Sequence, residues 1–228
     1  MLGLFALREG GRLNVFAPRS LREPLCGPLG LGGVLNSFCG VEWHELAMDG
    51  GGCFGVPPLS GPGVGTSQNR LKAELQTAKT AALSCRMIAL PGGPPLYAPG
   101  ATNGPHSVAY QFRDAKTGGR LLVAPDVAAV NAELLEALKN SDVVLFDGTF
   151  WSGDDLTAVR PGARTPEQMG HVTIKDGSLD LLAKLPAKRK IYTHINNTNP
   201  ILAAQSPERA AVEAAGITVG YDGLEFEI

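Results

Sequence analysis

Three polar residues each follow an apolar segment that is typical of a β-strand, and their side chains suit metal binding. Asp126 follows LLVAP, Asp147 follows VVLF and His194 follows KIYT. In a sheet flanked by helices, ligands gather where strands end at their carboxyl side. Because carboxylates and neutral imidazoles are ordinary metal ligands, these residues could converge on one metal ion. The alternative is that each aspartate caps a helix or forms a turn.

The sequence offers two further candidates, His171 and Trp151. Gly170 lets the backbone bend, or a ligand approach closely, just before His171; a histidine on a surface loop is the alternative. Trp151 follows D-G-T-F and could form the wall of a pocket for an aromatic substrate, whereas packing in the core is the alternative. His44 lies in an alternating strand, which indicates a structural role, and His106 fits either a loop or a ligand role.

The loop that carries His194 is unusually rich in amides. Residues 193–200 read T-H-I-N-N-T-N-P, and such a loop needs partners or a ligand to order it. Asn196 and Asn197 are therefore candidate substrate-binding residues. The alternative is an Asx-rich turn that satisfies its own backbone, which explains the Asn and Thr residues but leaves His194 unexplained.

The elements that must position these residues alternate between strands and helices. An initial hairpin is predicted around the turn at residues 117–119, and Asn131 is placed to cap the helix that follows. Strands are predicted at Ser107–Arg113, Arg120–Ala124, Asp142–Phe146 and Lys190–Thr193, and a second helix at Ser178–Leu185. This alternation predicts an α/β (α+β) fold in which helices cover a mixed sheet.

The two ends of the chain and its Gly/Pro-rich stretch complete this outline. Strands are expected at Leu13–Ala17 and Val41–Leu46, and a Gly/Pro-rich surface loop at 49–67 is followed by an amphipathic helix at Asn69–Ser84. Near the C-terminus, a helix begins at Ser206 and ends at Gly216. Two strands, Ile217–Tyr221 and Leu224–Ile228, are predicted to form a hairpin about Asp222-Gly223.

Composition excludes several classes of partner. The 228 residues are 44% hydrophobic and 18% charged with a formal net charge of −2, which is typical of a globular protein. No block of Lys or Arg is present to attract nucleic acid or an anionic membrane. No basic segment precedes the apolar N-terminus, so no signal peptide is expected. The four cysteines form no C-x-x-C pair, and we expect a soluble, cytoplasmic protein with reduced thiols.

Several motifs resemble one known family. These are D-G-T-F-W (147–151), R-T-P-E-Q-M-G-H (164–171), H-I-N-N-T-N-P-I-L (194–202) and Y-D-G-L-E-F (221–226). In order and spacing they closely resemble the coenzyme PQQ synthesis protein B (PqqB) family, which acts in the biosynthesis of pyrroloquinoline quinone. The resemblance is strong from about Arg86 to Ile228 and fainter from Met1 to Leu46. It fails at about 49–85, which therefore looks like an insertion in one domain spanning 1–228.

The resemblance implies a fold and a set of roles. The family has the metallo-β-lactamase αββα sandwich, with a metal site at one edge of the paired sheets. His194 matches its last metal-ligating histidine, and Asp126 falls where many members of this fold place a metal-bridging aspartate. Asp147 and His171 match motif positions near the site, as catalytic candidates. The first metal motif of the fold, of the H-x-H-x-D-H or D-x-x-x-D-H type, is absent, which implies a missing N-terminal part and weak metal binding by this chain alone.

The resemblance further implies an enzyme. Family members look like non-haem iron oxygenases that hydroxylate the tyrosine ring of a small precursor derived from Glu and Tyr, although zinc is a possible metal. The substrate would lie near Trp151 and the Asn-rich loop, and other PQQ biosynthesis proteins would be partners. Two alternatives are a carrier of PQQ or its precursor and a metal-dependent hydrolase. Redox activity with Fe(II) and O₂ would distinguish the enzyme from both.

Overall fold

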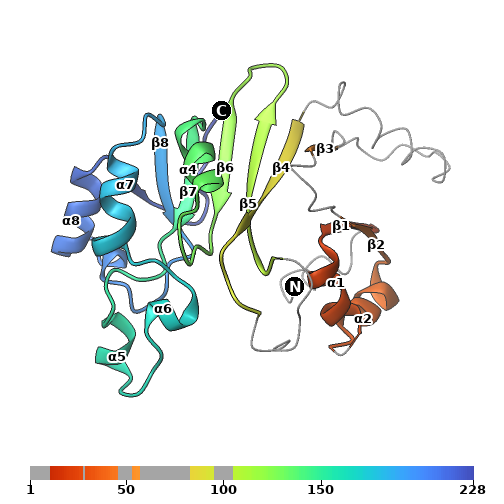
Figure 1. The fold of residues 1–228 in the computed structure, drawn as a ribbon, viewed down its shortest axis with the longest axis horizontal. Helices are drawn as coiled ribbons and strands as arrows, with labels where there is room; N and C mark the ends of the chain where they lie inside the picture. Colours follow the sequence, from red (N-terminus) through yellow and green to blue (C-terminus); the bar gives the residue numbers. More distant parts are fainter. Residues whose placement is uncertain (1–10, 28, 46–52, 57–82, 95–104) are drawn as a thin grey trace. The chain divides into compact units, whose positions relative to one another are not determined.

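The chain folds into two compact units in the computed structural model. One unit comprises Met1–Gly52 and Gly93–His106, and the other comprises Cys53–Gly92 and Ser107–Ile228. The structure describes residues 11–27, 29–45, 53–56, 83–94 and 105–228, with the backbone alone at 53–56 (Figure 1). We describe each unit by itself. The prediction of a single domain stays a prediction.

The first unit is built on two parallel strands joined by two helices. Strand β1 (Leu13–Ala17) pairs with β2 (Val41–Glu45), and α1 (Arg19–Cys26) and α2 (Leu31–Phe38) connect them. A parallel pair needs such a crossover. Both strands were predicted. The His44 ring stacks on Phe16 at 4.5 Å between ring centroids, and its Nε2 lies 3.0 Å from Asn14 Oδ1, which agrees with a structural role.

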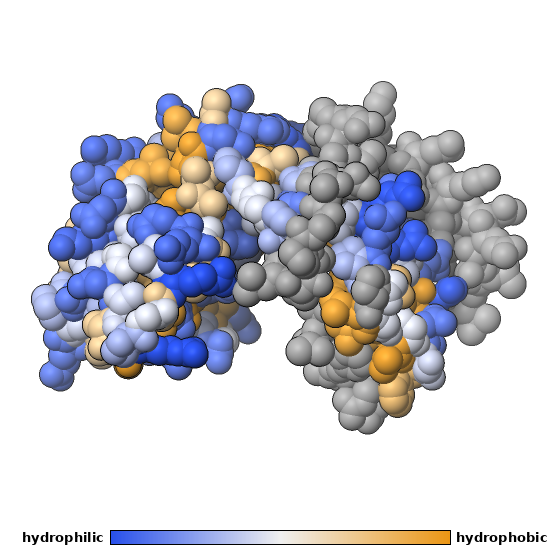
Figure 2. Space-filling model, turned by 60° about the horizontal axis from the view of Figure 1, so that its bottom comes forward, coloured by the Kyte–Doolittle hydropathy of each residue, from blue (hydrophilic) through white to orange (hydrophobic). Residues whose placement is uncertain are grey.

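Apolar side chains reach the surface of this unit on its two helices and between them. Leu21, Leu29, Val34 and Phe38 are all more than a third exposed, and Phe38 is the most exposed of them at 63%. Figure 2 shows apolar surface (orange) on this unit, with polar side chains (blue) beside it. In the part of the second unit that the structure describes, the exposed large apolar side chains are those of three separate segments, Val159, Leu202 and Tyr221. Such single exposures are ordinary for a globular surface.

The second unit contains a mixed sheet of seven strands in the order β3-β4-β5-β6-β7-β8-β9. Pairing is antiparallel from β3 to β6 and parallel from β6 to β9. The strands are β3 (Cys53–Val56), β4 (Leu83–Leu90), β5 (Ser107–Asp114), β6 (Arg120–Ala124), β7 (Val143–Asp147), β8 (Arg189–Thr193) and β9 (Thr218–Val219). The predicted hairpin is confirmed as β5–β6, and the predicted strands near 142–146 and 190–193 are confirmed as β7 and β8.

Helices cover one face of this sheet and bury a shared core. Helix α4 (Ala132–Lys139) begins at Asn131, whose side chain accepts a hydrogen bond from the backbone N–H of Leu134 at 2.8 Å, as predicted. The other helical segments among the described residues of this unit are α5 (Asp155–Val159), α6 (Pro166–Met169), a π-helical turn (Ile174–Ser178), α7 (Leu179–Ala183), a 3₁₀ turn (Pro200–Leu202) and α8 (Pro207–Ala214). Leu122, Leu134, Phe146, Leu182 and Val212 are fully buried in one cluster.

The buried hydroxyl of Tyr192 shows how closely this core is packed. The π-helical turn brings Ser178 to Tyr192, where the two hydroxyl oxygens lie 2.9 Å apart. Burial, which outweighs this hydrogen bond, raises the pKa of Tyr192 well above its ordinary value. The phenol is therefore neutral near physiological pH. The Tyr192 ring packs in the core, and its hydroxyl group is hydrogen-bonded to Ser178.

At one border of the sheet, the structure contradicts the predicted loop and the end of the predicted helix. The Gly/Pro-rich stretch contains strand β3, because its backbone pairs with β4 from Cys53↔Arg86 to Val56↔Leu83. Of the predicted helix at Asn69–Ser84, most lies outside the described residues, and its last residues belong to β4. The sequence could not reveal this pairing, since it depends on an edge strand formed elsewhere in the chain.

The predicted C-terminal hairpin does not form. Only Thr218–Val219 is a strand, and it pairs in parallel with β8, while residues 224–228 lie outside any strand. Ile217 and Val219 are each 2% exposed and join the core, so burial favours pairing with β8. The turn itself exists, since the Leu224 N–H donates to the Tyr221 carbonyl and Gly223 has a φ of 83°. Beyond it the chain ends beside the β5–β6 turn, where Thr117 Oγ1 donates to the Ile228 carbonyl oxygen at 3.4 Å.

Candidate metal centre

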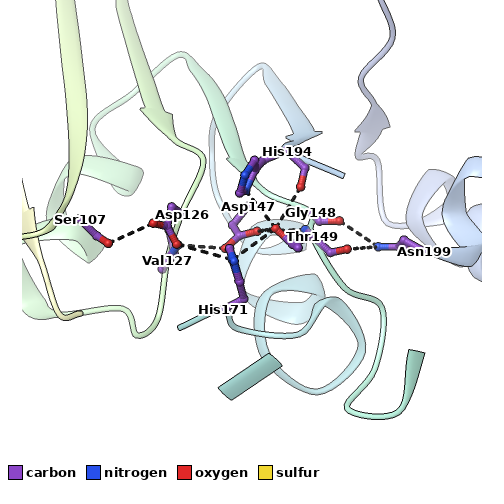
Figure 3. Close-up of polar contacts among 9 residues, drawn as sticks. All are labelled: Ser107, Asp126, Val127, Asp147, Gly148, Thr149, His171, His194 and Asn199. Carbon is purple, nitrogen blue, oxygen red and sulfur yellow. Dashed lines mark hydrogen bonds and ion pairs between the residues drawn. The ribbon is translucent and has the colours of Figure 1, made fainter. Parts of the chain in front are cut away.

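Asp147, His171 and His194 converge at the carboxyl end of the parallel strands (Figure 3). Each offers one ligand atom, and these atoms all lie within 4.8 Å of one another. Asp147 is the last residue of β7, and His194 directly follows its neighbour β8. His171 follows α6 and reaches the same point. The structure thus brings together three of the residues that the sequence singled out.

Asp147 is the fixed centre of the group. Its side chain is fully buried and accepts four hydrogen bonds. The Val127 N–H and His171 Nδ1 meet Oδ2 at 2.9 and 2.8 Å, and the Thr149 N–H and Oγ1 meet Oδ1 at 3.0 and 2.6 Å. A buried carboxylate is costly unless it is hydrogen-bonded in this way. These contacts hold the carboxylate in one orientation.

A short helix with caps at both ends positions His171. Thr165 and Gln168 form a reciprocal capping box at the start of α6, and Gly170 ends the helix with a φ of 88°. His171 Nδ1 then lies 2.8 Å from Asp147 and 3.6 Å from Asp126 Oδ1. Burial alone lowers the pKa of His171, but the hydrogen bond and charge of Asp147, with the charge of Asp126, outweigh it and raise the pKa above 6.5.

His194 has an unusual backbone conformation. Its φ is 55°, and among the described residues it is the only non-glycine with a positive φ. The side chain is exposed, and its Nδ1 lies 3.1 Å from Thr149 Oγ1. Gly148 lets the two loops approach, because a Cβ there would lie 2.8 Å from the Tyr192 Cβ and 3.0 Å from the Thr193 carbonyl oxygen. Strain at a non-glycine residue is typical of a functional site.

Asp126 lies at the edge of this group. It follows β6, the strand next to β7, and its Oδ2 accepts a hydrogen bond from Ser107 Oγ at 3.1 Å. Its side chain is 47% exposed and meets the group through His171 at 3.6 Å. The three strand-end residues therefore follow three adjacent parallel strands, but the compact trio contains His171 in place of Asp126. The assignment of Asp126 as a metal ligand stays a prediction.

The candidate substrate residues lie apart from the trio's polar contacts. Trp151 is partly buried against the hydrophobic core, in agreement with the packing alternative. The Asn196 side chain donates to Thr198 Oγ1 at 3.0 Å, as expected of a loop that satisfies its own polar groups. Asn197 is exposed, and its side chain makes no hydrogen bond with any residue that the structure describes. A role in substrate binding stays a prediction for all three.

The sequence reasoning missed two residues that hold the site together. Thr149 contacts Asp147 and both histidines through its hydroxyl. Asn199 is 2% exposed, and its Nδ2 donates to the Gly148 carbonyl at 2.8 Å, so it ties the loop after β8 to the loop after β7. Its Oδ1 also caps the 3₁₀ turn at Ile201. The only sequence signals were the short D-G-T string and an Asn directly before a proline.

The donor set suits a divalent cation. Two imidazoles and a carboxylate with open positions form the set that non-haem Fe(II) sites use, and zinc accepts the same ligands. The Nδ1 atoms of both rings face Thr149 or Asp147, so their Nε2 atoms are not engaged by these hydrogen bonds. Such outer hydrogen bonds are what orient histidine ligands in metal sites. On these contacts the residues fit a bound metal.

Comparison with known proteins agrees with this description. The profile of the β-lactamase superfamily domain matches residues 1–195. The chain is 35% identical to coenzyme PQQ synthesis protein B of Cupriavidus taiwanensis and 39% identical to that of Pseudomonas fluorescens strain Pf0-1. The matches cover 99% and 98% of this chain and 68% of each relative.

Solved structures of other proteins are similar to this chain in fold. The crystal structure of Zn²⁺-bound PqqB from Methylobacterium extorquens matches with a TM-score of 0.76 and 27% identity, over 100% of this chain and 69% of that one. A diphosphatase from the PhnP family matches with a TM-score of 0.54 and 19% identity, which shows the fold alone. The β-lactamase-like fold class predicted from the sequence is confirmed. Across the part of the chain that the structure describes, no helix is both long and apolar enough to cross a membrane.

Proposed function

The chain belongs to the coenzyme PQQ synthesis protein B family of the β-lactamase superfamily, and on this basis we propose that it is a metal-dependent hydroxylase in PQQ biosynthesis. Its substrate would be a small precursor derived from Glu and Tyr, hydroxylated on the tyrosine ring. The observation that supports a metal enzyme is the trio Asp147, His171 and His194, whose ligand atoms lie within 4.8 Å of one another. A trio of two histidines and a carboxylate suits Fe(II) and dioxygen.

The residues of the site divide into metal-holding and proton-handling groups. In this proposal His194 and Asp126 hold the metal, while His171 and Asp147 handle protons. When bound, a non-haem iron ion would supply the redox chemistry that hydroxylation by dioxygen requires. Asp147 holds the His171 ring through Nδ1 at 2.8 Å, so that pair can take up or release a proton at the phenol. Trp151, Asn196 and Asn197 would contact the substrate.

Zinc is the competing metal. The solved relative from Methylobacterium extorquens carries Zn²⁺, and a site of N and O ligands binds Zn²⁺ more tightly than Fe²⁺. Zinc has no redox chemistry. Metal binding alone therefore does not distinguish iron from zinc, and the assignment of iron must be tested by turnover.

The direct test is iron binding and turnover by the purified chain. We expect Fe(II), added without oxygen, to bind less tightly to His194→Ala and Asp126→Asn than to the wild-type chain. With O₂, a two-electron reductant such as ascorbate and a Glu-Tyr peptide, the wild-type product should gain one oxygen atom on the tyrosine ring, as read by mass spectrometry, while the second oxygen atom of O₂ is reduced to water. His44→Ala is the matched control, because His44 lies in the other unit. Equal iron binding by His194→Ala and the wild type would contradict the site.

The same assay separates the two alternative functions. A carrier would bind PQQ or its precursor without metal and without turnover. A hydrolase would act with Zn²⁺ and without O₂. Oxygen consumption that depends on Fe(II) would favour the hydroxylase over both.

Location and partners form the last part of the proposal. We place the protein in the cytoplasm, with a small peptide-derived precursor and other PQQ biosynthesis proteins as partners. Cys26 and Cys39 are free thiols, in keeping with a reducing compartment. Fractionation of cells that express the tagged chain would test the location.

A further inference from the structure

The hydroxyl of Thr149 lies at the centre of the polar network (Figure 3). Its Oγ1 is 2.6 Å from Asp147 Oδ1 and 3.3 Å from His171 Nδ1. It is also 2.9 Å from the His194 carbonyl oxygen and 3.1 Å from His194 Nδ1. A hydroxyl has one proton to donate and two lone pairs with which to accept. Only one of these four contacts can therefore use the hydroxyl proton.

The two oxygen partners decide where that proton goes. A carboxylate oxygen and a carbonyl oxygen can only accept, and the 2.6 Å contact has the length of a charge-assisted O–H···O⁻ bond. If the proton instead pointed at His194 Nδ1, the oxygens of Thr149 and Asp147 would face each other without a hydrogen in a buried site. The hydroxyl proton therefore goes to Asp147 Oδ1, the oxygen at the shorter distance. His194 Nδ1 must then carry its own hydrogen and donate it to Thr149.

The same reasoning applies to the second imidazole. His171 Nδ1 faces Asp147 Oδ2 at 2.8 Å and Thr149 Oγ1 at 3.3 Å, and neither atom has a proton to give it. Both neutral rings are thus protonated at Nδ1, which leaves the lone pair on each Nε2. Metals bind the unprotonated nitrogen of a neutral imidazole, and the hydrogen bond at the other nitrogen sets which one that is.

Thr149 also contacts the strained part of the backbone. His194 has a φ of 55°, a conformation that a side chain with a Cβ rarely adopts. The Thr149 hydroxyl meets both the ring and the carbonyl group of this one residue, at 3.1 and 2.9 Å. Because its one proton goes to Asp147, the hydroxyl holds the His194 ring by accepting from Nδ1, and it lies against the carbonyl group without donating to it.

We propose that Thr149 is a positioning residue that fixes His194 in the Nδ1–H tautomer, and so presents Nε2 to a cation. The cation itself rests on the proposed function. The assignment of the His194 tautomer does not rest on the proposed function, because it is a property of the metal-free chain. The inference about Thr149 and the proposed function can therefore be contradicted by separate results.

The experiment reads the tautomer directly. In the metal-free chain labelled with ¹⁵N-histidine, at about pH 8 where an imidazole is neutral, long-range ¹H–¹⁵N spectra should show His194 protonated at Nδ1. Thr149→Val keeps the shape but lacks the hydroxyl, and should shift His194 toward the Nε2–H tautomer. Thr149→Ser should restore the wild-type spectrum. Thr157→Val is the control, since the Thr157 hydroxyl only bonds the Asp154 carbonyl at the start of α5.

Zinc affinity provides the second measurement. Competition with a chromophoric chelator should show affinity about 10–100-fold lower for Thr149→Val, the usual cost of losing an outer hydrogen bond to a ligand. Thr149→Ser and Thr157→Val should match the wild type. His194 in the Nε2–H form in the wild-type chain would overturn the inference, even if Thr149→Val failed to fold. An unchanged tautomer and affinity in Thr149→Val would also overturn it.

One result separates the inference from the proposed function. The wild-type chain could bind neither Zn²⁺ nor Fe(II) while its His194 tautomer still followed the hydroxyl at position 149. That outcome would uphold the inference about Thr149 and overturn the metal-dependent function.

Discussion

At the scale of single residues, the site is organised around one buried negative charge. Asp147 is fully buried and receives hydrogen bonds from two backbone N–H groups, one hydroxyl and one imidazole. The exposed His194 and the partly exposed Asp126 lie around it. The carboxylate that is most deeply buried thus sets the geometry, and the more exposed groups are left to meet a ligand.

Replacing Asp147 by Asn should destabilise the chain strongly. The amide would turn an NH₂ group toward one of the donors that now meet the carboxylate, so a buried donor would lose its acceptor. Breaking a buried charged network costs about 3–5 kcal/mol, and urea unfolding of the metal-free chain would measure it. Asp126→Asn is the control, since the Asp126 side chain is 47% exposed and a substitution at the surface stays within about 0.5 kcal/mol. Equal losses for the two variants would contradict the central role of Asp147.

The pairing of His171 with Asp147 predicts a pH dependence of stability. Because the pKa of His171 is raised above 6.5 in the folded chain, the folded state binds this proton more tightly than the unfolded state. Its contribution is full below the unfolded value of 6.5 and is lost as the pH rises through the raised pKa. The free energy of unfolding of the wild-type chain, relative to His171→Gln, should therefore be larger at about pH 5.5 than at about pH 8.5. A difference that does not change with pH would contradict the pairing.

At the scale of elements, the site depends on how two loops are joined. The loops after β7 and β8 leave neighbouring parallel strands, paired up to Asp147↔Thr193. Gly148 permits their close approach, and the buried Asn199 side chain fastens one to the other at the Gly148 carbonyl. The Asn-rich loop is thus ordered from within the protein.

Replacing Asn199 by Ala should loosen both loops at once. The Gly148 carbonyl and the Ile201 N–H would lose their partners, at a cost of about 1–3 kcal/mol for a buried unsatisfied group. Thermal unfolding would measure the loss, and hydrogen exchange should rise at the Asn196 N–H, which donates to the Thr149 carbonyl. Asn197→Ala is the matched control, because Asn197 is exposed. Stability losses of the same size would show that Asn199 does not fasten the loops.

At the scale of the whole molecule, the candidate metal site belongs to one of the two compact units. Asp147, His171 and His194 all lie in the unit that contains the seven-stranded sheet. Each residue comes from a separate segment of that unit, so the group exists only when β7, β8 and the α6 loop are folded together. If the group binds a metal, as proposed, metal binding and folding of this unit are coupled.

Zinc should stabilise the folded chain through this coupling. A ligand that binds only the folded state adds about 2.7 kcal/mol at a free concentration of about 100 times its Kd. Calorimetry with increasing Zn²⁺ should show a rising unfolding temperature for the wild-type chain and no rise for His194→Ala. His106→Ala serves as the control, because His106 lies in the other unit. A rise that persists in His194→Ala would place the bound zinc elsewhere.

The sequence alone determined the features that depend on local patterns. Apolar runs predicted β6, β7 and β8, and the same runs were enough to place Asp126, Asp147 and His194 at strand ends. Ser206, like Asn131, was identified as a helix cap, and its side chain accepts from the Arg209 N–H at 3.0 Å. Caps and periodicity involve residues within a few positions of one another, so a short stretch of sequence contains all the residues that make such contacts.

Tertiary structure alone decided the features that depend on long-range pairing. The short strand β9 joins β8 because burying Ile217 and Val219 outweighs a local hairpin, and β3 forms because β4 offers it an edge. The trio is completed by His171, 24 residues from Asp147, because α6 turns the chain back to the strand ends. Thr149 and Asn199 gained their roles from contacts across 45 and 51 residues. A short stretch of sequence cannot reveal contacts between residues so far apart in the chain, since these contacts form only when the strand register and the loop packing are fixed together.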